Sequence, residues 1–487
     1  MSVFKKLAGE TALYGVSSIL ARMVNFILVP IHTEVFKNRG DYGVVGQLYA
    51  WIALGVVLYT FRMEASYFRY TSNDDKSSSY ANAKVFTLIT AIAFSIVVLL
   101  FSDQIAGWLD IEGYGHLVKY AAGIVALDAI CELPFARLRL QKRPIKFVLI
   151  KFVNIVINLL LNVYFLLWRP RHGIADAQDL LVYVFVANLF ASLVTLILLS
   201  KEYLFEGFSF NQAELKKILS YAWPLLIVAL SAVINDAMTR QFLGWLSPGT
   251  LVDRQNAMGE YNACIKFAVF ISLFVQAFRY AAEPFFFKHM HAADAKKDYS
   301  QITTYFTQFM MIGFVGVLLY LDFFKQYIVR TPAYLQAIGV VPIVLMANVF
   351  LGIYYNVSNW YRLTDRTRYG MYSAVIGVAL TIVFNLILVP KYSYIGTAWA
   401  MLICYAGMTI VTYAWGQRYY PIPYELGKIV SVMIVGVSVY LIVSGMDRWL
   451  EPGLVAKFAI HTLWMLGFVV LFNWPLVKTV LARQNQT

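Results

Sequence analysis

The chain has 487 residues, 60% of them hydrophobic, and a mean hydropathy of +0.64, values that exclude a soluble globular protein. A net charge of +13 would suit a nucleic-acid-binding protein. However, most of the basic residues fall in alternate loops and tails between apolar stretches, as the positive-inside rule expects of a membrane protein with a cytoplasmic N-terminus. The charge therefore indicates topology, and no nucleic-acid partner is expected.

Apolar stretches follow one another along the whole chain, each long enough for the roughly 20 residues that cross a bilayer as a helix. They predict an all-α, polytopic membrane protein with about 14 transmembrane helices. We expect it in the inner (cytoplasmic) membrane with both termini in the cytoplasm. The stretches are residues 8–33, 42–68, 83–101, 115–137, 145–168, 178–200, 214–246, 256–285, 300–321, 333–361, 369–389, 393–416, 427–444 and 454–478.

Charged side chains lie inside several of these stretches. A basic residue or Asp at the centre of a spanning helix costs roughly 2.5–3.5 kcal/mol, so these residues are expected to face water, a partner or a ligand. Excess base suits an anionic ligand, and arginine binds phosphate through a planar fork of donors. The predicted substrate-binding residues are Arg22, Asn25, Arg62, Glu64, Lys151, Lys266, Arg279 and Glu283.

Four other residues are candidates for ion coupling. Asp128 and Glu132 lie one helical turn apart in the fourth stretch, with no base at the same depth, and Asp236 and Arg240 have i,i+4 spacing in the seventh. Coupling to protons, to sodium ions or to the membrane potential alone is left open. No cofactor and no metal site is predicted. His289 and His291 form a weak metal pattern that a solvated loop explains better.

A second interpretation of these charges stays open. Asp236–Arg240 and Arg279–Glu283 would also serve as internal ion pairs that fix helix packing. Arg62 lies in the inner half of its stretch, where a long side chain can reach the headgroups. The acids Asp128 and Glu132 would equally suit burial against a neighbouring helix.

Two sequence echoes predict an internal repeat. Gly40-Asp41-Tyr42 recurs as Gly259-Glu260-Tyr261, and Arg139, Arg143 and Asn162 recur at the same spacing as Arg362, Arg366 and Asn385. The offset is six apolar stretches, an even number, so both copies enter the membrane in the same direction. We expect two parallel six-helix lobes around a central cavity, at residues 1–205 and 206–420, followed by two further helices at 421–487.

The segments GDYGVVGQLYAW…RMEASYFRY and GEYNACIKFAVFISLFVQAFRYAAEPFFF resemble bacterial polysaccharide-biosynthesis and O-antigen flippases of the multidrug/oligosaccharidyl-lipid/polysaccharide exporter superfamily. The segment ARMVNF, with Arg22, is similar to the start of lipid II flippases. The resemblance implies alternating access of two lobes around a basic cavity that takes an undecaprenyl-pyrophosphate-linked sugar. It also implies a lipid-tail groove formed by the last two helices.

The resulting hypothesis is a flippase that moves a polyprenyl-pyrophosphate oligosaccharide to the outer leaflet, and not an enzyme. Expected partners are that lipid-linked oligosaccharide, membrane lipids and polysaccharide polymerase or assembly proteins; a monomer is expected. The alternatives are a lipid II flippase, a multidrug or cation exporter, whose cleft should be dominated by acids, and a membrane glycosyltransferase or polymerase. The last of these usually carries a large outer domain or a DxD motif, and the sequence has neither.

Overall fold

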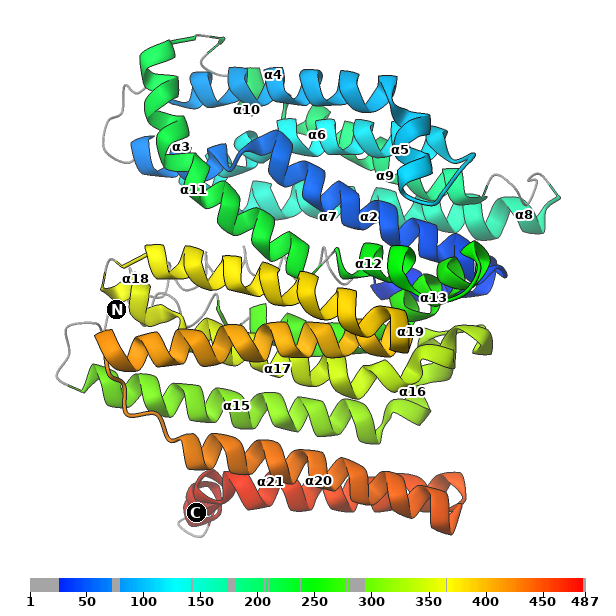
Figure 1. Cartoon of the computed structure of the whole chain (residues 1–487), viewed down its shortest axis with the longest axis vertical. Helices are drawn as coiled ribbons and strands as arrows, with labels where there is room; N and C mark the ends of the chain where they lie inside the picture. The colour runs from blue at the N-terminus through cyan, green and yellow to red at the C-terminus, as the bar shows by residue number, and fades with distance from the viewer. Residues whose placement is uncertain are drawn as a thin grey trace.

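The computed structural model describes residues 26–71, 79–141, 143–173, 180–204, 207–208, 210–236, 238–276, 278–279, 294–364 and 366–484. These residues form helices that lie side by side in one common direction, stacked from α4 at one edge to α20 and α21 at the other (Figure 1). The longer helices are α2 (Arg39–Thr60), α4 (Ser79–Leu100), α6 (Gly115–Leu140), α7 (Pro144–Val163), α9 (Leu180–Leu198), α11 (Gln212–Asp236), α13 (Leu251–Cys264), α15 (Ala295–Leu319), α17 (Val341–Val357), α19 (Arg368–Tyr419), α20 (Leu426–Leu450) and α21 (Leu454–Gln484).

Short helical segments connect or extend the long helices. They are α3 (Met63–Thr71), α5 (Ser102–Trp108), a π-helical turn at Tyr164–Trp168, α8 (Arg169–Arg171), α10 (Ser200–Leu204), α12 (Thr239–Leu246), the 3₁₀ turn η3 (Ile265–Ala268), α16 (Leu321–Ile328), the 3₁₀ segment η4 (Pro332–Val340) and α18 (Asn359–Leu363). A further short apolar helix covers Phe26–Val35.

The all-α, polytopic membrane architecture is confirmed. Within the described residues, eleven segments are long and apolar enough to cross a membrane. The 52-residue α19 holds two of the expected spans, and the backbone at Ser393, with φ of 47°, interrupts it between them. Helix α6 coincides with the fourth expected span but carries too many polar residues to count among the eleven, and most of the first expected span lies outside the described residues. Fourteen spans therefore stays a prediction.

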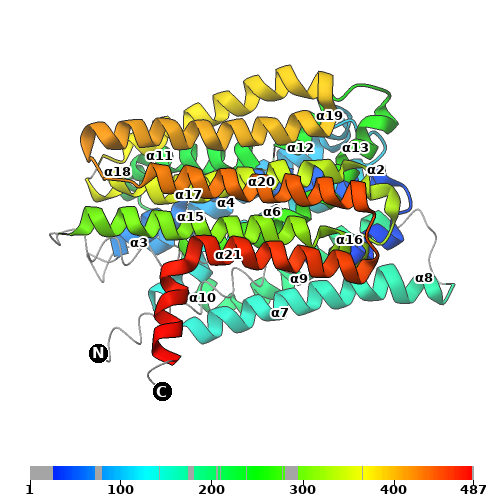
Figure 2. The ribbon, with the colours of Figure 1, turned by 90° about the horizontal axis from the view of Figure 1, so that it is seen from below.

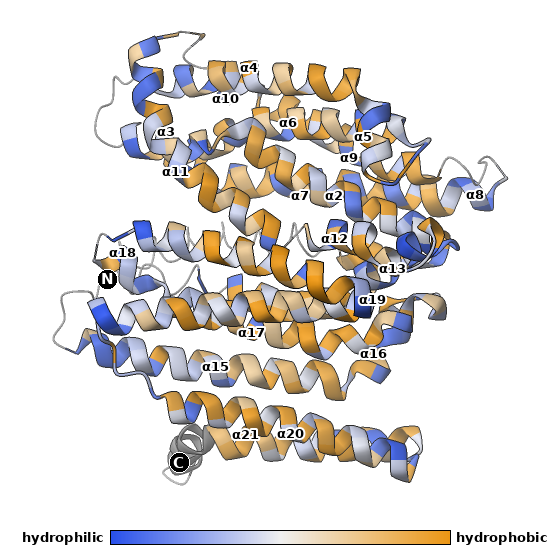
Figure 3. Cartoon of the chain, viewed as in Figure 1, coloured by the Kyte–Doolittle hydropathy of each residue, from blue (hydrophilic) through white to orange (hydrophobic). Residues whose placement is uncertain are grey.

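The distribution of apolar side chains fits a bilayer. Hydrophobic residues cover the middle of the helices, and polar residues gather toward their ends (Figure 3). Outward-facing side chains such as Ile89, Ile96 and Leu386 are about half exposed, which suits contact with acyl chains. The three cysteines, Cys131, Cys264 and Cys404, are buried and unpaired, as expected of packing residues.

The helices pack in two main groups. Helices α2, α4, α6, α7 and α9 contact one another, and α15, α17, α19 and α20 contact one another. Helix α13 crosses from the second group onto α2, and α11 packs against both α3 and α19. These contacts fit the two expected lobes, whose boundaries at residues 205 and 420 stay a prediction.

The last two helices form a pair at one edge of the molecule, beside α15 (Figures 1 and 2). Helix α20 packs closely there, since a Cβ atom at Gly436 would lie 2.5 Å from the Met311 side chain. Between α20 and α21 lies an apolar groove of about 320 Å³. Its lining residues are Val435, Val439, Leu463, Trp464, Gly467, Phe468 and Leu471.

Candidate substrate and coupling site

The second expected span breaks near its C-terminal end. Helix α2 ends at Thr60, α3 begins at Met63, and the two residues between them, Phe61 and Arg62, have φ of 50° and 58°. Non-glycine residues rarely adopt this left-handed conformation, and two in succession indicate backbone strain. Such strain is concentrated at functional sites, so the break is a first indication that Arg62 has a role beyond packing.

Glu64 follows the break and contacts charged residues of α6. Its carboxylate forms an ion pair with Arg139 at 2.5 Å, and it interacts electrostatically with Glu132. Glu132 also interacts electrostatically with Arg62. We call Arg62, Glu64, Glu132 and Arg139 the Arg62 network.

Two carboxylates placed side by side repel each other unless cations lie close by. Here the Arg62 and Arg139 guanidinium groups offset the repulsion between Glu64 and Glu132. Glu64 is half-buried, with 16% of its side chain exposed, so the pair is largely shielded from solvent.

Asp128 and Lys151 extend the charged cluster along α6 and α7. The Ser192 hydroxyl donates to Asp128 at 2.7 Å, and Lys151 interacts electrostatically with both Asp128 and Glu132. The Lys151 ammonium also lies 4.1 Å from the centre of the Phe135 ring. The expectation that the two α6 acids have no base at their depth is thus wrong, because neighbouring helices supply Arg62 and Lys151.

Arg279 and Lys266 have their described contacts elsewhere. The Arg279 guanidinium lies 5.1 Å from the centre of the Tyr355 ring in α17. Lys266, in η3, interacts electrostatically with His32, whose side chain is 5% exposed. A cation–π contact contributes about 0.5–2 kcal/mol.

Three of the predicted site residues, Arg22, Asn25 and Glu283, lie outside the described residues, as do His289 and His291. The Arg279–Glu283 pair therefore stays a prediction. Within the described part of the chain, no group of three His, Cys, Asp or Glu residues is arranged to hold a metal ion.

Helix α11 ends at Asp236 and α12 begins at Thr239. The expected Asp236–Arg240 pair stays a prediction. Arg240 interacts electrostatically with Tyr42, and its Nε atom is buried without a hydrogen-bond partner. The side chain of Asp236 is outside the described part.

The residues of the second sequence echo share local geometry. The backbone N–H of Arg143 donates to the carbonyl five residues earlier at 2.9 Å, and that of Arg366 does the same at 2.8 Å. Asn162 and Asn385, 1% and 0% exposed, each donate from Nδ2 to the carbonyl four residues earlier. Their Oδ1 atoms are both buried without a hydrogen-bond partner. The two copies therefore fold alike at these positions.

The residues of the first echo, by contrast, pack against each other. A Cβ atom at Gly259 would lie 1.9 Å from the Arg39 carbonyl oxygen, and one at Gly43 would lie 2.5 Å from the Gln255 carbonyl oxygen, so glycine permits this close crossing of α2 and α13. Arg39 then forms an ion pair with Glu260 at 2.6 Å. We call Arg39, Gly43, Gly259 and Glu260 the Arg39 closure.

Further polar contacts hold the helices together at the same end of the molecule as the Arg39 closure. The Gln47 and Trp51 side chains both donate to Gln241, at 2.8 and 2.9 Å, and the Tyr334 hydroxyl donates to the Phe36 carbonyl at 2.7 Å. Under the expected topology this is the outer end of the helices. Sequence analysis found the echoed motifs but not their contact, because similarity between two segments says nothing about whether they touch.

Residues 7–290, more than half of the chain, match the family described as polysaccharide biosynthesis protein. The chain belongs to this family. The predicted recognition is thereby confirmed, and the family is one of membrane transporters and not of enzymes. No curated protein matched this polysaccharide biosynthesis protein by sequence.

Solved structures share the fold of the polysaccharide biosynthesis protein. One is the lipid II flippase MurJ in an inward closed conformation, 13% identical, with a TM-score of 0.72 over 96% of this chain and 99% of that one. Another is an inward-facing multidrug resistance MATE family transporter of the MOP superfamily, which is 13% identical. Its TM-score is 0.60 over 84% of this chain and 94% of that one. A Vibrio cholerae MATE transporter mutant is 14% identical, with a TM-score of 0.52 over 87% of this chain and 99% of that one. At such identities the likeness concerns the fold.

Proposed function

We propose that this polysaccharide biosynthesis protein is a flippase for an undecaprenyl-pyrophosphate-linked oligosaccharide. It moves the lipid from the inner to the outer leaflet of the cytoplasmic membrane by alternating access, for polysaccharide or O-antigen synthesis. The observation that carries the proposal is the Arg62 network, a cluster of charged side chains at a strained helix break in a membrane protein of this family. Intramembrane charges of this kind mark substrate or ion pathways.

The basic residues suit a pyrophosphate headgroup. Arg62, Arg279 and Lys266, with Arg22 from the sequence alone, would bind its oxygens, each hydrogen bond to a charged group contributing about 1.5–3 kcal/mol. A few such bonds draw the headgroup from water without trapping it. An inside-negative membrane potential favours export of the anion by about 2.3 kcal/mol per charge per 100 mV.

The apolar groove between α20 and α21 suits the polyprenyl chain. Its lining side chains are aliphatic or aromatic, and the two helices carry outward-facing apolar residues such as Ile434 and Leu463. A hydrocarbon chain could occupy the groove while the headgroup lies among the lobes, so the two parts of the substrate would be held separately. Contact with polymerase or assembly proteins and a monomeric state are further proposals.

The Arg39 closure accounts for one state of the cycle. With the N-terminus in the cytoplasm, as we propose, this closure lies at the outer end, and the structure is that of a flippase shut toward the outside. Export then requires the α2–α13 crossing to separate while the opposite end closes. The glycine contacts, the Arg39–Glu260 ion pair and the hydrogen bonds to Gln241 would all have to separate in that step.

Mass spectrometry of lipid that co-purifies with the protein tests the substrate. A polyprenyl-pyrophosphate oligosaccharide is the expected species, and a headgroup with a peptide stem would instead identify a lipid II flippase. Arg22→Ala should abolish flipping of that lipid in proteoliposomes while expression and thermal unfolding stay unchanged. Recovery of an organic cation, or normal flipping by Arg22→Ala, would contradict the phosphate-binding role.

Glu132→Gln tests whether protonation of Glu132 takes part in coupling. The introduced amide can still donate to Glu64, so the fold should persist, but it cannot release a proton. We expect the dependence of flipping on pH between 5.5 and 8.5 to flatten. Glu34→Gln, at an exposed glutamate 3.9 Å from Arg171, is the matched control. An unchanged pH profile in Glu132→Gln would exclude this carboxyl pair from coupling.

A further inference from the structure

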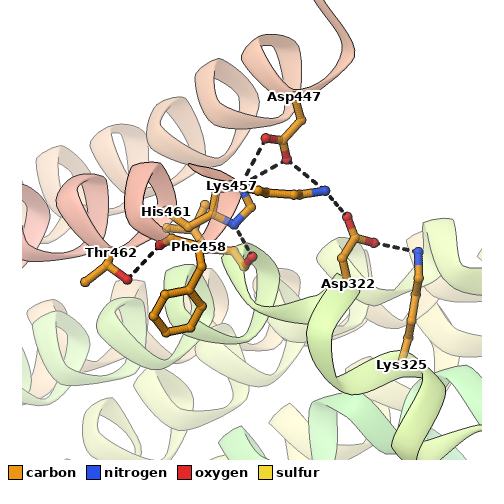
Figure 4. A network of polar contacts seen from close by, with 8 residues as sticks. Asp322, Lys325, Asp447, Lys457, Phe458, His461 and Thr462 are labelled. Atoms are coloured by element: carbon orange, nitrogen blue, oxygen red, sulfur yellow. Dashed lines mark hydrogen bonds and ion pairs between the residues drawn. The ribbon is translucent and has the colours of Figure 1, made fainter. Parts of the chain in front are cut away.

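His461 lies at the centre of a polar cluster that joins three parts of the protein (Figure 4). It belongs to the second turn of α21 and is 2% exposed. Its Nδ1 lies 2.5 Å from the Leu319 carbonyl oxygen at the end of α15, and its Nε2 lies 3.0 and 3.1 Å from the two carboxylate oxygens of Asp447 in α20. One imidazole thus bridges α21 to both α15 and α20.

Both ring nitrogens of His461 face hydrogen-bond acceptors. A neutral imidazole has one N–H and one lone pair, so it can satisfy only one of these two partners. An imidazolium donates from both nitrogens and satisfies the Leu319 carbonyl and the Asp447 carboxylate together. The imidazolium thus fits both contacts, whereas the neutral ring fits only one of them. Loss of one proton would turn a nitrogen lone pair toward an acceptor and break one attachment.

Ion pairs surround the cluster and keep Asp322 ionised. Lys457 of α21 forms ion pairs with Asp447, at 3.3 Å, and with Asp322 of α16, and Asp322 also pairs with Lys325 of its own helix at 2.6 Å. Burial raises the pKa of Asp322, but hydrogen bonds and electrostatic attraction from the two lysines outweigh it and leave that pKa below its ordinary value. Asp322 thus stays charged near neutral pH, where histidine is the side chain that changes charge.

Helix α21 depends on these contacts more than other helices do. Only 11% of its apolar span is buried, compared with 61% for α15. In a bilayer, apolar surface gains little by leaving lipid, so packing and polar contacts hold such a helix in place. Besides the His461 and Lys457 contacts, Thr462 is hydrogen-bonded to Tyr320 at 2.8 Å. Among the described side chains of α21, residues 454–472, these polar anchors lie in the first turns.

We infer that His461 is a positioning residue whose imidazolium fixes α21, and with it one wall of the apolar groove, and whose deprotonation releases that helix. Leu463, Trp464 and Phe468 follow His461 within two turns and line the groove, so movement of α21 changes the groove directly. Acidity on the side of the membrane where α20 ends and α21 begins would therefore regulate how the groove holds its occupant. That the occupant is a polyprenyl chain rests on the proposed function.

Cysteine labelling measures this release without any transport. Leu319, whose carbonyl oxygen contacts His461, is 3% exposed, whereas Val455 on the first turn of α21 is 82% exposed. The measured quantity is the rate at which a water-soluble maleimide labels Leu319→Cys, divided by the rate for Val455→Cys. This ratio removes the intrinsic pH dependence of thiol chemistry. It follows the fraction of molecules in which α21 is released. The native cysteines are buried and provide the background. We expect the ratio to rise about tenfold between pH 5.5 and 8.5, as expected for one lost hydrogen bond to a charged group.

Two variants separate the switch from a merely structural contact. Asp447→Asn supplies an amide that can donate to a neutral His461, so α21 should stay fixed and the ratio should no longer change with pH. His461→Gln cannot bridge as an imidazolium and should give a high ratio at both pH values. An unchanged ratio in the protein with native His461 and Asp447, or the same pH-dependent rise in Asp447→Asn, would overturn the inference. Because this experiment does not measure flipping, a negative result would contradict the role of His461 but not the flippase proposal.

Discussion

Gly259→Val should open the Arg39 closure and stop the transport cycle. The added Cβ atom alone would lie 1.9 Å from the Arg39 carbonyl oxygen, a backbone atom that cannot move aside without shifting α2. Overpacking of this kind costs about 1–3 kcal/mol and occasionally more, so the closed state should lose roughly 5- to 150-fold in population. The Arg39–Glu260 ion pair, held at 2.6 Å by the same crossing, would be lost with it.

Labelling at Asn262 measures the opening. Asn262 is 4% exposed, and a Cβ atom at Gly46 of α2 would lie 2.6 Å from its side-chain nitrogen, so the side chain lies within the crossing. A membrane-impermeant maleimide should label Asn262→Cys slowly in the otherwise native chain and many times faster with Gly259→Val. Gly445→Val is the control, since nothing lies within 4 Å of a Cβ atom at that helical glycine. Continued protection of Asn262→Cys together with normal flipping would show that the crossing is not a gate.

Arg62→Gly should abolish or strongly reduce flipping while the protein becomes no less stable. Arg62 has φ of 58°, a conformation that glycine adopts without strain, so the substitution separates the side chain from the backbone break. Loss of one hydrogen bond between a charged donor and the pyrophosphate removes about 1.5–3 kcal/mol, which corresponds to a 10- to 150-fold slower rate. The Glu64–Glu132 pair would also lose one of its two neighbouring guanidinium groups.

Flipping in proteoliposomes and thermal unfolding should be measured on the same preparations. Arg62→Lys keeps the charge but not the planar fork of donors, so we expect partial activity. Arg171→Ala is the matched control, because Arg171 is 69% exposed and has only a loose ion pair to Glu34 at 3.9 Å. Wild-type flipping by Arg62→Gly would show that the arginine side chain has no part in substrate binding.

The structure reassigns several of the charges that the sequence singled out. Arg62, Glu64, Asp128, Glu132 and Lys151 were expected in separate roles, as substrate ligands or coupling groups, but lie in one continuous cluster. Arg139, which the sequence offered only as part of an echo, completes that cluster through its ion pair with Glu64. Spacing along the chain could not predict this, because the partners come from different helices.

Hydropathy could not predict the helix breaks either. Residues 42–68 and 214–246 each read as one apolar stretch, yet each contains two helices, divided at Phe61–Arg62 and between Asp236 and Thr239. A break inside an apolar stretch changes the path of the backbone and not its composition.

The sequence alone determined the class of the protein, because hydropathy is a property of each segment and a bilayer imposes one helix length on all of them. It also contained the repeated arginines and asparagines, whose matching backbone hydrogen bonds are local. Only the tertiary structure decided which charges meet. Arg39 and Glu260 are separated by 221 residues, and Gln47 and Gln241 by 194, so their contacts depend on how whole helices cross. Burial makes an unpaired charge unfavourable, but the choice of partner depends on helix packing.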